Sequence, residues 1–380
     1  MTILRRFGDG NEAPQGPFIP TSTPIEEKAM TKKWMQLLLA PVIVAVGLCV
    51  MSANIAKAAD DCANRGSLDN MFCDENKDLV ADTPKDKGKW KDPGTLVFTY
   101  TPVEDPAVYK DAFADFQAFL EKRTGKKVIY YTVQSNAAEV EAMRSGRLHI
   151  AGFSTGPTCY AVNLAGYVPM AVKGDAEGFQ GYRLLMIVRK DSSIQTMADL
   201  KGKKVAHTSA SSNSGNLAPR ALFPKLGITP EKDYTVVYSG KHDQSILGVG
   251  YGDYDAAPVA GDVFKRMAQA GRINEADYRI IWQSDVFPTS SFGYAHDLNP
   301  ELVKKIVAAF NEYRFTPEMQ KTFGGADRFF PVTYQKDWAV IRDIAEANGE
   351  TFNQSGLQKI AEKEAAEAAK KKQEAEAKKQ

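Results

Sequence analysis

The chain has 380 residues, of which 43% are hydrophobic and 25% are charged, so it can build one large or two ordinary globular domains. Its 48 basic and 47 acidic side chains leave a formal net charge of +1. This balance argues against a protein that binds nucleic acid or anionic lipid through a global electrostatic field. An anionic ligand would have to be held by local hydrogen-bond donors.

The N-terminal region predicts an export signal in residues 30–58. Lys32 and Lys33 precede a mostly apolar run over residues 34–50, and Ala56-Lys57-Ala58 supplies a small-residue cleavage site. The alternative is a membrane anchor, because the run approaches the roughly 20 residues of a spanning helix. We favour cleavage after Ala58, since a polar segment follows. For residues 1–29, which are polar and contain several prolines, we expect an upstream extension, and the alternative is a misassigned start codon.

The cysteines point to an oxidising compartment. After cleavage, Cys62 and Cys73 lie together in a polar segment and linker, residues 59–94, where we expect them to form a disulfide. A metal site is disfavoured, because no histidine lies near them. Cys159 is left over, and we expect a buried apolar thiol. We expect neither a metal nor a cofactor.

Strands and helices alternate from residue 95 onward. We predict strands at 95–101, 128–133 and 148–153, and helices at 108–123 and 137–145. This order predicts a parallel, doubly wound sheet with helices on both faces. Ligands of such sheets lie at the carboxyl ends of the strands.

A second set of strands and helices follows the apolar strand at 182–189. We predict strands at 204–207, 235–238 and 256–259, helices at 218–226, 244–250 and 263–270, and a return crossing at 279–288. Helical segments at 300–313 and 334–348 complete the first lobe. We therefore expect a first lobe of residues 95–187 and 286–350, a second lobe of residues 188–285, and a cleft between them with a hinge at the two crossings.

The C-terminal residues 351–380 become rich in Ala, Glu, Lys and Gln. Their charge spacing favours an exposed helix, and we see no apolar stripe for a partner.

The strongest chemical signal is the turn at residues 208–215, Thr-Ser-Ala-Ser-Ser-Asn-Ser-Gly, between a strand and a helix. Hydroxyls and free N–H groups at the positive end of a helix suit a tetrahedral oxyanion. Ser211, Ser212, Asn213 and Ser214 are the candidate ligand residues. The alternative is ordinary helix capping by one serine.

A second turn of this kind covers residues 153–158. It presents Thr155 and Thr158 as candidate donors, together with Ser154, before another helix. If each lobe contributes one helix end, closure would surround an anion from both sides.

Two further candidates follow strands of the second lobe. His242 donates to a ligand oxygen, or it is a capping or core histidine. Asp262 accepts a hydrogen bond from a protonated ligand oxygen and so selects partly protonated acids, or it is the N-cap of the next helix.

These blocks, with residues 199–203 and 298–302, resemble the phosphate/phosphite/phosphonate-binding proteins of ABC importers over residues 95–343. The resemblance implies an α/β fold of the type II periplasmic-binding-protein class, with two doubly wound lobes joined by two hinge crossings. It matches the family's Ser-Thr-Ser-Gly turn to residues 212–215, with Asn213 in place of Thr. It also implies ligand roles for His242, Asp262 and Tyr182, and Tyr100 completes our candidate set.

Two departures from the family concern the ligand's substituent. Residues 134–136, Gln-Ser-Asn, stand where aminoalkylphosphonate binders have a Tyr, and residues 288–291 lack the second acid that an ammonium group would need. We therefore expect phosphite, a simple alkylphosphonate or phosphate as the ligand.

The resemblance implies a monomeric periplasmic binding protein that closes on its ligand and delivers it to an ABC permease in the inner membrane. One alternative is a sensor subunit that binds the same ligand for a kinase or chemoreceptor. Another is an enzyme with a Cys159–His242 site, although no other catalytic constellation is present and we expect no enzymatic activity.

Overall fold

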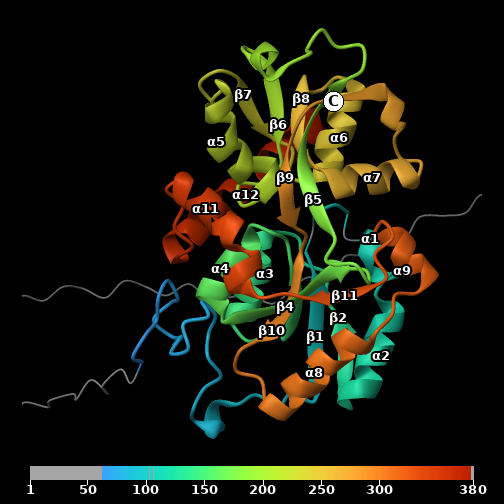
Figure 1. Ribbon diagram of the computed structural model, residues 1–380. Helices are drawn as coiled ribbons and strands as arrows, with labels where there is room; N and C mark the ends of the chain where they lie inside the picture. Colours follow the sequence, from blue (N-terminus) through green and yellow to red (C-terminus); the bar gives the residue numbers. More distant parts are fainter. Residues whose placement is uncertain (1–61, 102, 106, 378–380) are drawn as a thin grey trace, which may run out of the picture. The chain divides into compact units, whose positions relative to one another are not determined.

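Two mixed β-sheets with helices packed on them form the part of the chain that the computed structural model describes, residues 62–101, 103–105 and 107–377 (Figure 1). All of these residues belong to one compact unit. The expected signal peptide and upstream extension lie outside the described residues. We call each sheet with its helices a lobe.

The sheet of the first lobe has the strand order β11-β4-β10-β3-β1-β2. Its strands are β1 (Thr95–Tyr100), β2 (Lys127–Tyr130), β3 (Ile150–Phe153), β4 (Tyr167–Gly174), β10 (Ser291–Ala295) and β11 (Arg328–Pro331). Its helices are α1 (Ala107–Lys110), α2 (Ala114–Thr124), α3 (Asn136–Arg144), α4 (Pro157–Ala165), α8 (Pro300–Glu312), α9 (Pro317–Thr322) and α10 (Tyr334–Asp337). The helix expected at 108–123 is therefore two helices, separated by a turn at residues 111–113.

The sheet of the second lobe has the order β7-β6-β8-β5-β9. Its strands are β5 (Gly181–Arg189), β6 (Lys204–His207), β7 (Thr235–Tyr238), β8 (Ala256–Ala260) and β9 (Tyr278–Pro288). Its α-helices are α5 (Ala218–Leu222), α6 (His242–Tyr251) and α7 (Gly261–Gln269), and a π-helical turn, η3 (Asn213–Leu217), leads into α5. The helix α11 (Ala339–Ala347) follows α10 and packs against α5 and η3 of the second lobe. The remaining short helices are η1 (Lys87–Lys89), η2 (Met197–Leu200), η4 (Phe223–Leu226) and η5 (Glu275–Asp277).

The strands are parallel only in part. β1 runs parallel to β2 and β3, and β6 runs parallel to β7 and β8. β10 is antiparallel to β3 and β4, and β5 is antiparallel to β8 and β9. The parallel order expected for the strands at 95–101, 128–133 and 148–153 is confirmed. The sheets as wholes are mixed, because β10 and β5, which lie next to the crossings, run against their neighbours.

The crossings between the lobes also lie elsewhere than expected. β5 and β9 pair from Gly181↔Pro288 to Arg189↔Tyr278, side by side (Figure 1). The segment expected as a loop at 284–288 is therefore strand, because pairing satisfies backbone groups that a loop would leave open. The chain changes sheet between Gly174 and Gly181, and again between Pro288 and Ser291, rather than at residues 187 and 286.

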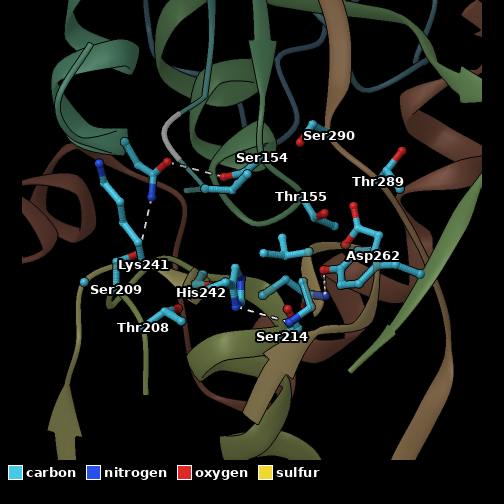
Figure 2. Close-up of a pocket in the computed structure, with 18 of the residues that line it drawn as sticks. Ser154, Thr155, Thr208, Ser209, Ser214, Lys241, His242, Asp262, Thr289 and Ser290 are labelled. Atoms are coloured by element: carbon cyan, nitrogen blue, oxygen red, sulfur yellow. Dashed lines mark hydrogen bonds between the residues drawn. The ribbon is translucent and has the colours of Figure 1, made fainter. Parts of the chain in front are cut away.

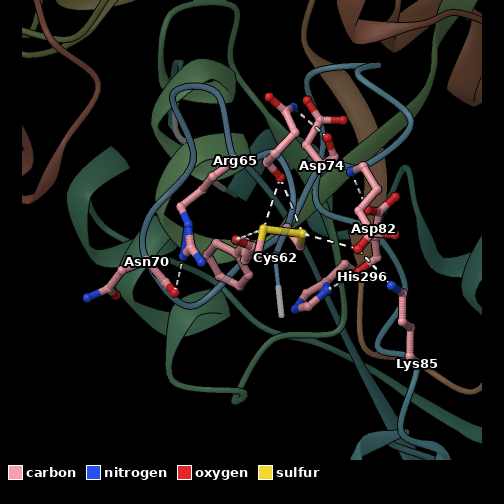
Figure 3. The surroundings of a disulfide bond; sticks show 11 residues. Cys62, Arg65, Asn70, Asp74, Asp82, Lys85 and His296 are labelled. Atoms are coloured by element: carbon pink, nitrogen blue, oxygen red, sulfur yellow. Dashed lines mark hydrogen bonds and ion pairs between the residues drawn. A yellow bond between two sulfur atoms is a disulfide. The ribbon is translucent and has the colours of Figure 1, made fainter. Parts of the chain in front are cut away.

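The segment before β1 packs on the first lobe instead of forming a free linker. The N–H of Asp69 donates to the Asn163 carbonyl at 2.8 Å, and Arg144 pairs with Asp69 at 3.1 Å. The predicted disulfide between Cys62 and Cys73 is confirmed, and Figure 3 shows it beside His296.

The C-terminal helix α12 (Gln354–Ala377) is not solvated along its whole length. Leu357 and Ile360 are buried at 3% exposure each, and α12 packs against α3. The expectation of an exposed helix is wrong for this first part, since two apolar side chains suffice to anchor it. Within the described residues, we find no helix with the length and apolar character needed to cross a membrane.

Candidate functional site

A cavity of about 50 Å³ lies between the lobes, and most of the residues that line it have polar side chains. Figure 2 shows Ser154 and Thr155 of the first lobe facing Ser214 and His242 of the second. Eight of the predicted site residues line it: Tyr100, Thr155, Tyr182, Ser212, Asn213, Ser214, His242 and Asp262.

Two predicted residues do not line the cavity. The hydroxyl of Thr158 is turned inward and bonds to Ser291 Oγ at 2.8 Å and to the Ser154 carbonyl at 2.9 Å. Ser211 Oγ instead accepts a hydrogen bond from Asn136 Nδ2 at 3.1 Å. Thr158 therefore supports the first turn of α4, and Ser211 helps to join the lobes.

The cavity also includes residues that sequence reasoning did not propose as ligand residues. They include Val103, Asn136, Thr208, Ser209, Lys241, Thr289 and Ser290. Thr289 and Ser290 lie in the second crossing, between β9 and β10. A pair of hydroxyl residues in a crossing segment is a signal that could have identified them. Asn136 stands at the start of a helix after β2, where a polar side chain can face the carboxyl edge of the sheet.

Capping and cavity lining are combined at the start of η3. Ser212 is the N-cap, and its Oγ accepts from the Gly215 N–H at 3.2 Å. The capping alternative is thus confirmed for Ser212, which still lines the cavity. A Cβ at Gly215 would lie 1.8 Å from Thr208 Oγ1, so only glycine lets Thr208 pack against this turn.

Three lining residues carry buried polar atoms with no hydrogen-bond partner. They are Thr208 Oγ1, Asn213 Oδ1 and Thr289 Oγ1. Asn213 Nδ2 donates to the Tyr182 hydroxyl at 3.1 Å, which fixes the orientation of the amide. Leaving a polar atom buried and unpaired costs about 1–3 kcal/mol, so three such atoms around one cavity suit a polar ligand that can pair with them.

His242 is a neutral hydrogen-bond donor. Its Nδ1 accepts from the Ala260 N–H at 3.2 Å, so the proton of the neutral ring lies on Nε2. Burial lowers the pKa of His242 to about 4. Nε2 lies 3.5 Å from Ser212 Oγ, at the cavity. The imidazole can therefore donate to a ligand oxygen without adding charge.

Asp262 is an ionised acceptor held by two cations. Its carboxylate lies 2.8 Å from Arg266 and 3.7 Å from Lys173. Burial alone would raise the pKa of Asp262, but Arg266 and Lys173 outweigh it and hold the pKa at about 2. The N-cap alternative is wrong, because α7 begins at Gly261 with Ala260 as its N-cap.

Contacts across the cleft hold the lobes together around the cavity. Arg266 of the second lobe pairs with Glu104 of the first at 2.7 Å. The backbone N–H of His242 donates to the Val103 carbonyl at 3.2 Å. Glu104 and Arg266 are both buried, and this pair forms only when the lobes meet.

The enzyme alternative with a Cys159–His242 pair is wrong. Cys159 is fully buried in α4 and does not line the cavity. Burial raises the pKa of its thiol to about 12, although a hydrogen bond with Tyr334 acts to lower this pKa. Such a thiol is not a nucleophile at neutral pH.

The family model of the periplasmic substrate-binding proteins of phosphonate ABC transporters matches residues 98–338, more than half of the chain. The chain belongs to this family. The resemblance seen in the sequence is thereby confirmed, and so is the type II binding-protein fold. The chain is a periplasmic substrate-binding protein of the phosphonate ABC-transporter type.

Named relatives and solved structures agree with this assignment. The chain is 31% identical over 263 residues to the phosphate-import protein PhnD of Mycolicibacterium smegmatis, covering 66% of this chain and 81% of that protein. It is 26% identical over 228 residues to the phosphonates-binding periplasmic protein of Escherichia coli, and the match covers 59% of this chain and 67% of that protein. The structure of PhnD1 from Prochlorococcus marinus with methylphosphonate superposes on this chain with a TM-score of 0.61 at 18% identity. The match covers 68% of this chain and 100% of that chain.

Proposed function

We propose that this protein binds a compact phosphorus oxyanion, which is phosphite, a simple alkylphosphonate or phosphate, and delivers it to an ABC permease in the inner membrane. The observation that carries the proposal is the convergence of Thr208 Oγ1, Thr289 Oγ1 and Asn213 Oδ1, all buried and unpaired, on one polar cavity. A tetrahedral oxyanion would supply acceptors to the hydroxyls and, where protonated, a donor to the amide oxygen.

The size of the cavity supports a small ligand. At about 10–15 Å³ for each water-sized sphere, 50 Å³ holds about four such spheres. That matches a phosphorus centre with four substituents and leaves little space for a longer organic group.

The charges favour a partly protonated acid without an ammonium group. The donors around the cavity are mainly neutral hydroxyls and the neutral His242 ring, with Lys241 as a cation in the lining. The Asp262 carboxylate accepts a hydrogen bond only from a protonated ligand oxygen. An ammonium group would find Asp262 already paired with Arg266 and Lys173. Relatives point the same way, since one is a phosphate-import protein and one structural neighbour holds methylphosphonate.

Binding proceeds by hinge closure in this proposal. The ligand contacts both lobes only when they meet, so it shifts the population of conformations towards the closed form that the permease recognises. The mature protein begins at Ala59 and acts as a monomer in the periplasm. It performs no chemistry on the ligand.

Calorimetric titration of the purified protein tests the proposal with phosphite, methylphosphonate, phosphate, aminoethylphosphonate and sulfate. We expect tight binding of at least one of the first three and weaker binding of aminoethylphosphonate. If none of the phosphorus acids binds, the proposed ligand class is wrong.

A further inference from the structure

A second hollow lies directly beside the oxyanion cavity. It is a groove of about 840 Å³ between α12, α3 and the loop before η3. Much of its wall is apolar and small, as shown by Ala137, Ala138, Ala210, Leu357, Ala361 and Ala365. The two hollows share wall residues, namely Asn136, Thr208, Ser209, Gly240 and Lys241. The same few side chains therefore separate a polar cavity from a much larger groove.

Asn136 is the member of this shared wall that bonds to both lobes. Its Oδ1 accepts from Thr101 Oγ1 at 3.2 Å and from Ser154 Oγ at 3.3 Å, both in the first lobe. Its Nδ2 donates to Ser209 Oγ at 3.3 Å and to Ser211 Oγ at 3.1 Å, both in the second lobe. An amide has two donor and two acceptor positions, so all four are used. The side chain is thus fixed in place when the lobes meet.

We infer that Asn136 is a selectivity gate that closes the oxyanion cavity towards the α12 groove and so restricts the protein to phosphorus acids with small substituents. This inference rests on the proposed function. With the amide in place, a substituent longer than a methyl group meets a side chain that four hydrogen bonds hold. Without it, the cavity and groove become continuous, and the alanine-rich groove accepts an apolar chain or ring of several carbons.

The test compares methylphosphonate, n-butylphosphonate and phenylphosphonate by calorimetry on the purified protein and on Asn136→Ala. The wild type should bind methylphosphonate at least 100-fold more tightly than the two larger ligands. In Asn136→Ala, the affinity for methylphosphonate should fall by up to about tenfold, because bonds between the lobes are lost. The affinity for the two larger ligands should rise at least tenfold.

Two further variants separate the gate from a general weakening of the lobes. Asn136→Asp keeps the size of the side chain and should keep the preference for methylphosphonate, whatever its effect on affinity. Ala361→Trp fills the groove from α12, away from the oxyanion cavity. As a single substitution, Ala361→Trp should leave the affinity for methylphosphonate unchanged. Combined with Asn136→Ala, it should remove the gain in affinity for n-butylphosphonate and phenylphosphonate.

The outcomes distinguish the inference from the function beneath it. If the wild type binds methylphosphonate but Asn136→Ala keeps the same order of affinities, the gate is wrong and the proposed function stands. Wild-type protein that binds n-butylphosphonate as tightly as methylphosphonate also overturns the gate. If the wild type binds none of these ligands nor phosphite nor phosphate, both the function and the gate are wrong. Should Asn136→Ala not fold, Asn136→Ser shortens the same side chain and is judged by the same ratio of affinities.

Discussion

A Cβ atom placed on Gly156 would lie 2.2 Å from the carbonyl oxygen of Ser211. Gly156 is the N-cap of α4 in the first lobe, and Ser211 lies in the loop before η3 in the second. The φ of Gly156 is −71°, which any residue adopts. Glycine is therefore needed here for the approach of the two lobes and not for a special backbone conformation.

Gly156→Ala should hinder closure and weaken ligand binding at least tenfold, because the methyl group collides with backbone that cannot move aside. The open form should fold normally, since the backbone conformation suits alanine. Calorimetry with the best phosphorus acid measures the loss. Gly94→Ala is the control, because a Cβ there has no neighbour within 4 Å. Wild-type affinity in Gly156→Ala would show that closure does not bring these backbones together.

His242→Ala should weaken binding by about 1–3 kcal/mol, or roughly 5- to 150-fold, because a buried ligand oxygen loses its donor. His242→Gln should recover part of this affinity, since its amide can place an N–H near the position of Nε2. Calorimetry on both variants checks the prediction. Equal affinities in wild type and His242→Ala would remove the imidazole from the site.

Arg266→Met should lower the free energy of unfolding by about 3–5 kcal/mol, because it leaves the buried Glu104 and Asp262 carboxylates without their main cation. Urea denaturation of the ligand-bound protein measures this. Arg272→Met is the matched control, since Arg272 is 37% exposed and lies 3.9 Å from Glu104. For Arg272→Met we expect the free energy of unfolding to fall by at most about 1 kcal/mol. Equal effects of the two substitutions would contradict the role given to the buried pair.

Stability should fall in mild acid because of His207. This ring is fully buried, with Nδ1 2.9 Å from Asn216 Oδ1 and Nε2 3.0 Å from the Tyr234 hydroxyl, and burial lowers its pKa from 6.5 to about 4. The unfolded chain therefore binds the proton more readily. The stabilisation is present above pH 6.5 and is lost as the pH falls towards 4, by on the order of 3 kcal/mol at pH 4.

Urea denaturation between pH 7 and pH 4, followed together with the NMR titration of the His207 ring, checks this prediction. His242 contributes in the same direction when the lobes are closed, since burial also lowers its pKa to about 4. A His207 ring that titrates near pH 6.5 in the folded protein would contradict the predicted effect.

Local sequence was sufficient for some strands and insufficient for others. The strands at 204–207 and 235–238 were predicted with the bounds that the structure has, because their β-branched residues and flanking turns are local signals. β4 and β10 were missed, since Pro169 and Gly293 argue against a strand. A Cβ on Gly293 would lie 2.2 Å from the Val168 carbonyl, so this glycine reflects a close approach between neighbouring strands.

The candidate site divides in the same way. The Ser-rich turn at 208–215 and the turn at 153–158 that carries Thr155 could be proposed, because each places several hydroxyl residues between a strand and a helix. The pairing of Asp262 with Arg266 lies one helical turn apart and was accessible from spacing. The contact of Lys173 with Asp262 and the bonds of Asn136 to Ser209 and Ser211 were not, because these partners belong to the other lobe and are brought near only by the tertiary fold.

The most direct test is a crystal structure of the purified protein with methylphosphonate or phosphite. We expect the phosphorus acid in the cavity between the lobes, with an oxygen within hydrogen-bond distance of His242 Nε2 and of the hydroxyls of Thr208 and Thr289. A ligand ordered elsewhere, or in this cavity without those contacts, would contradict the account.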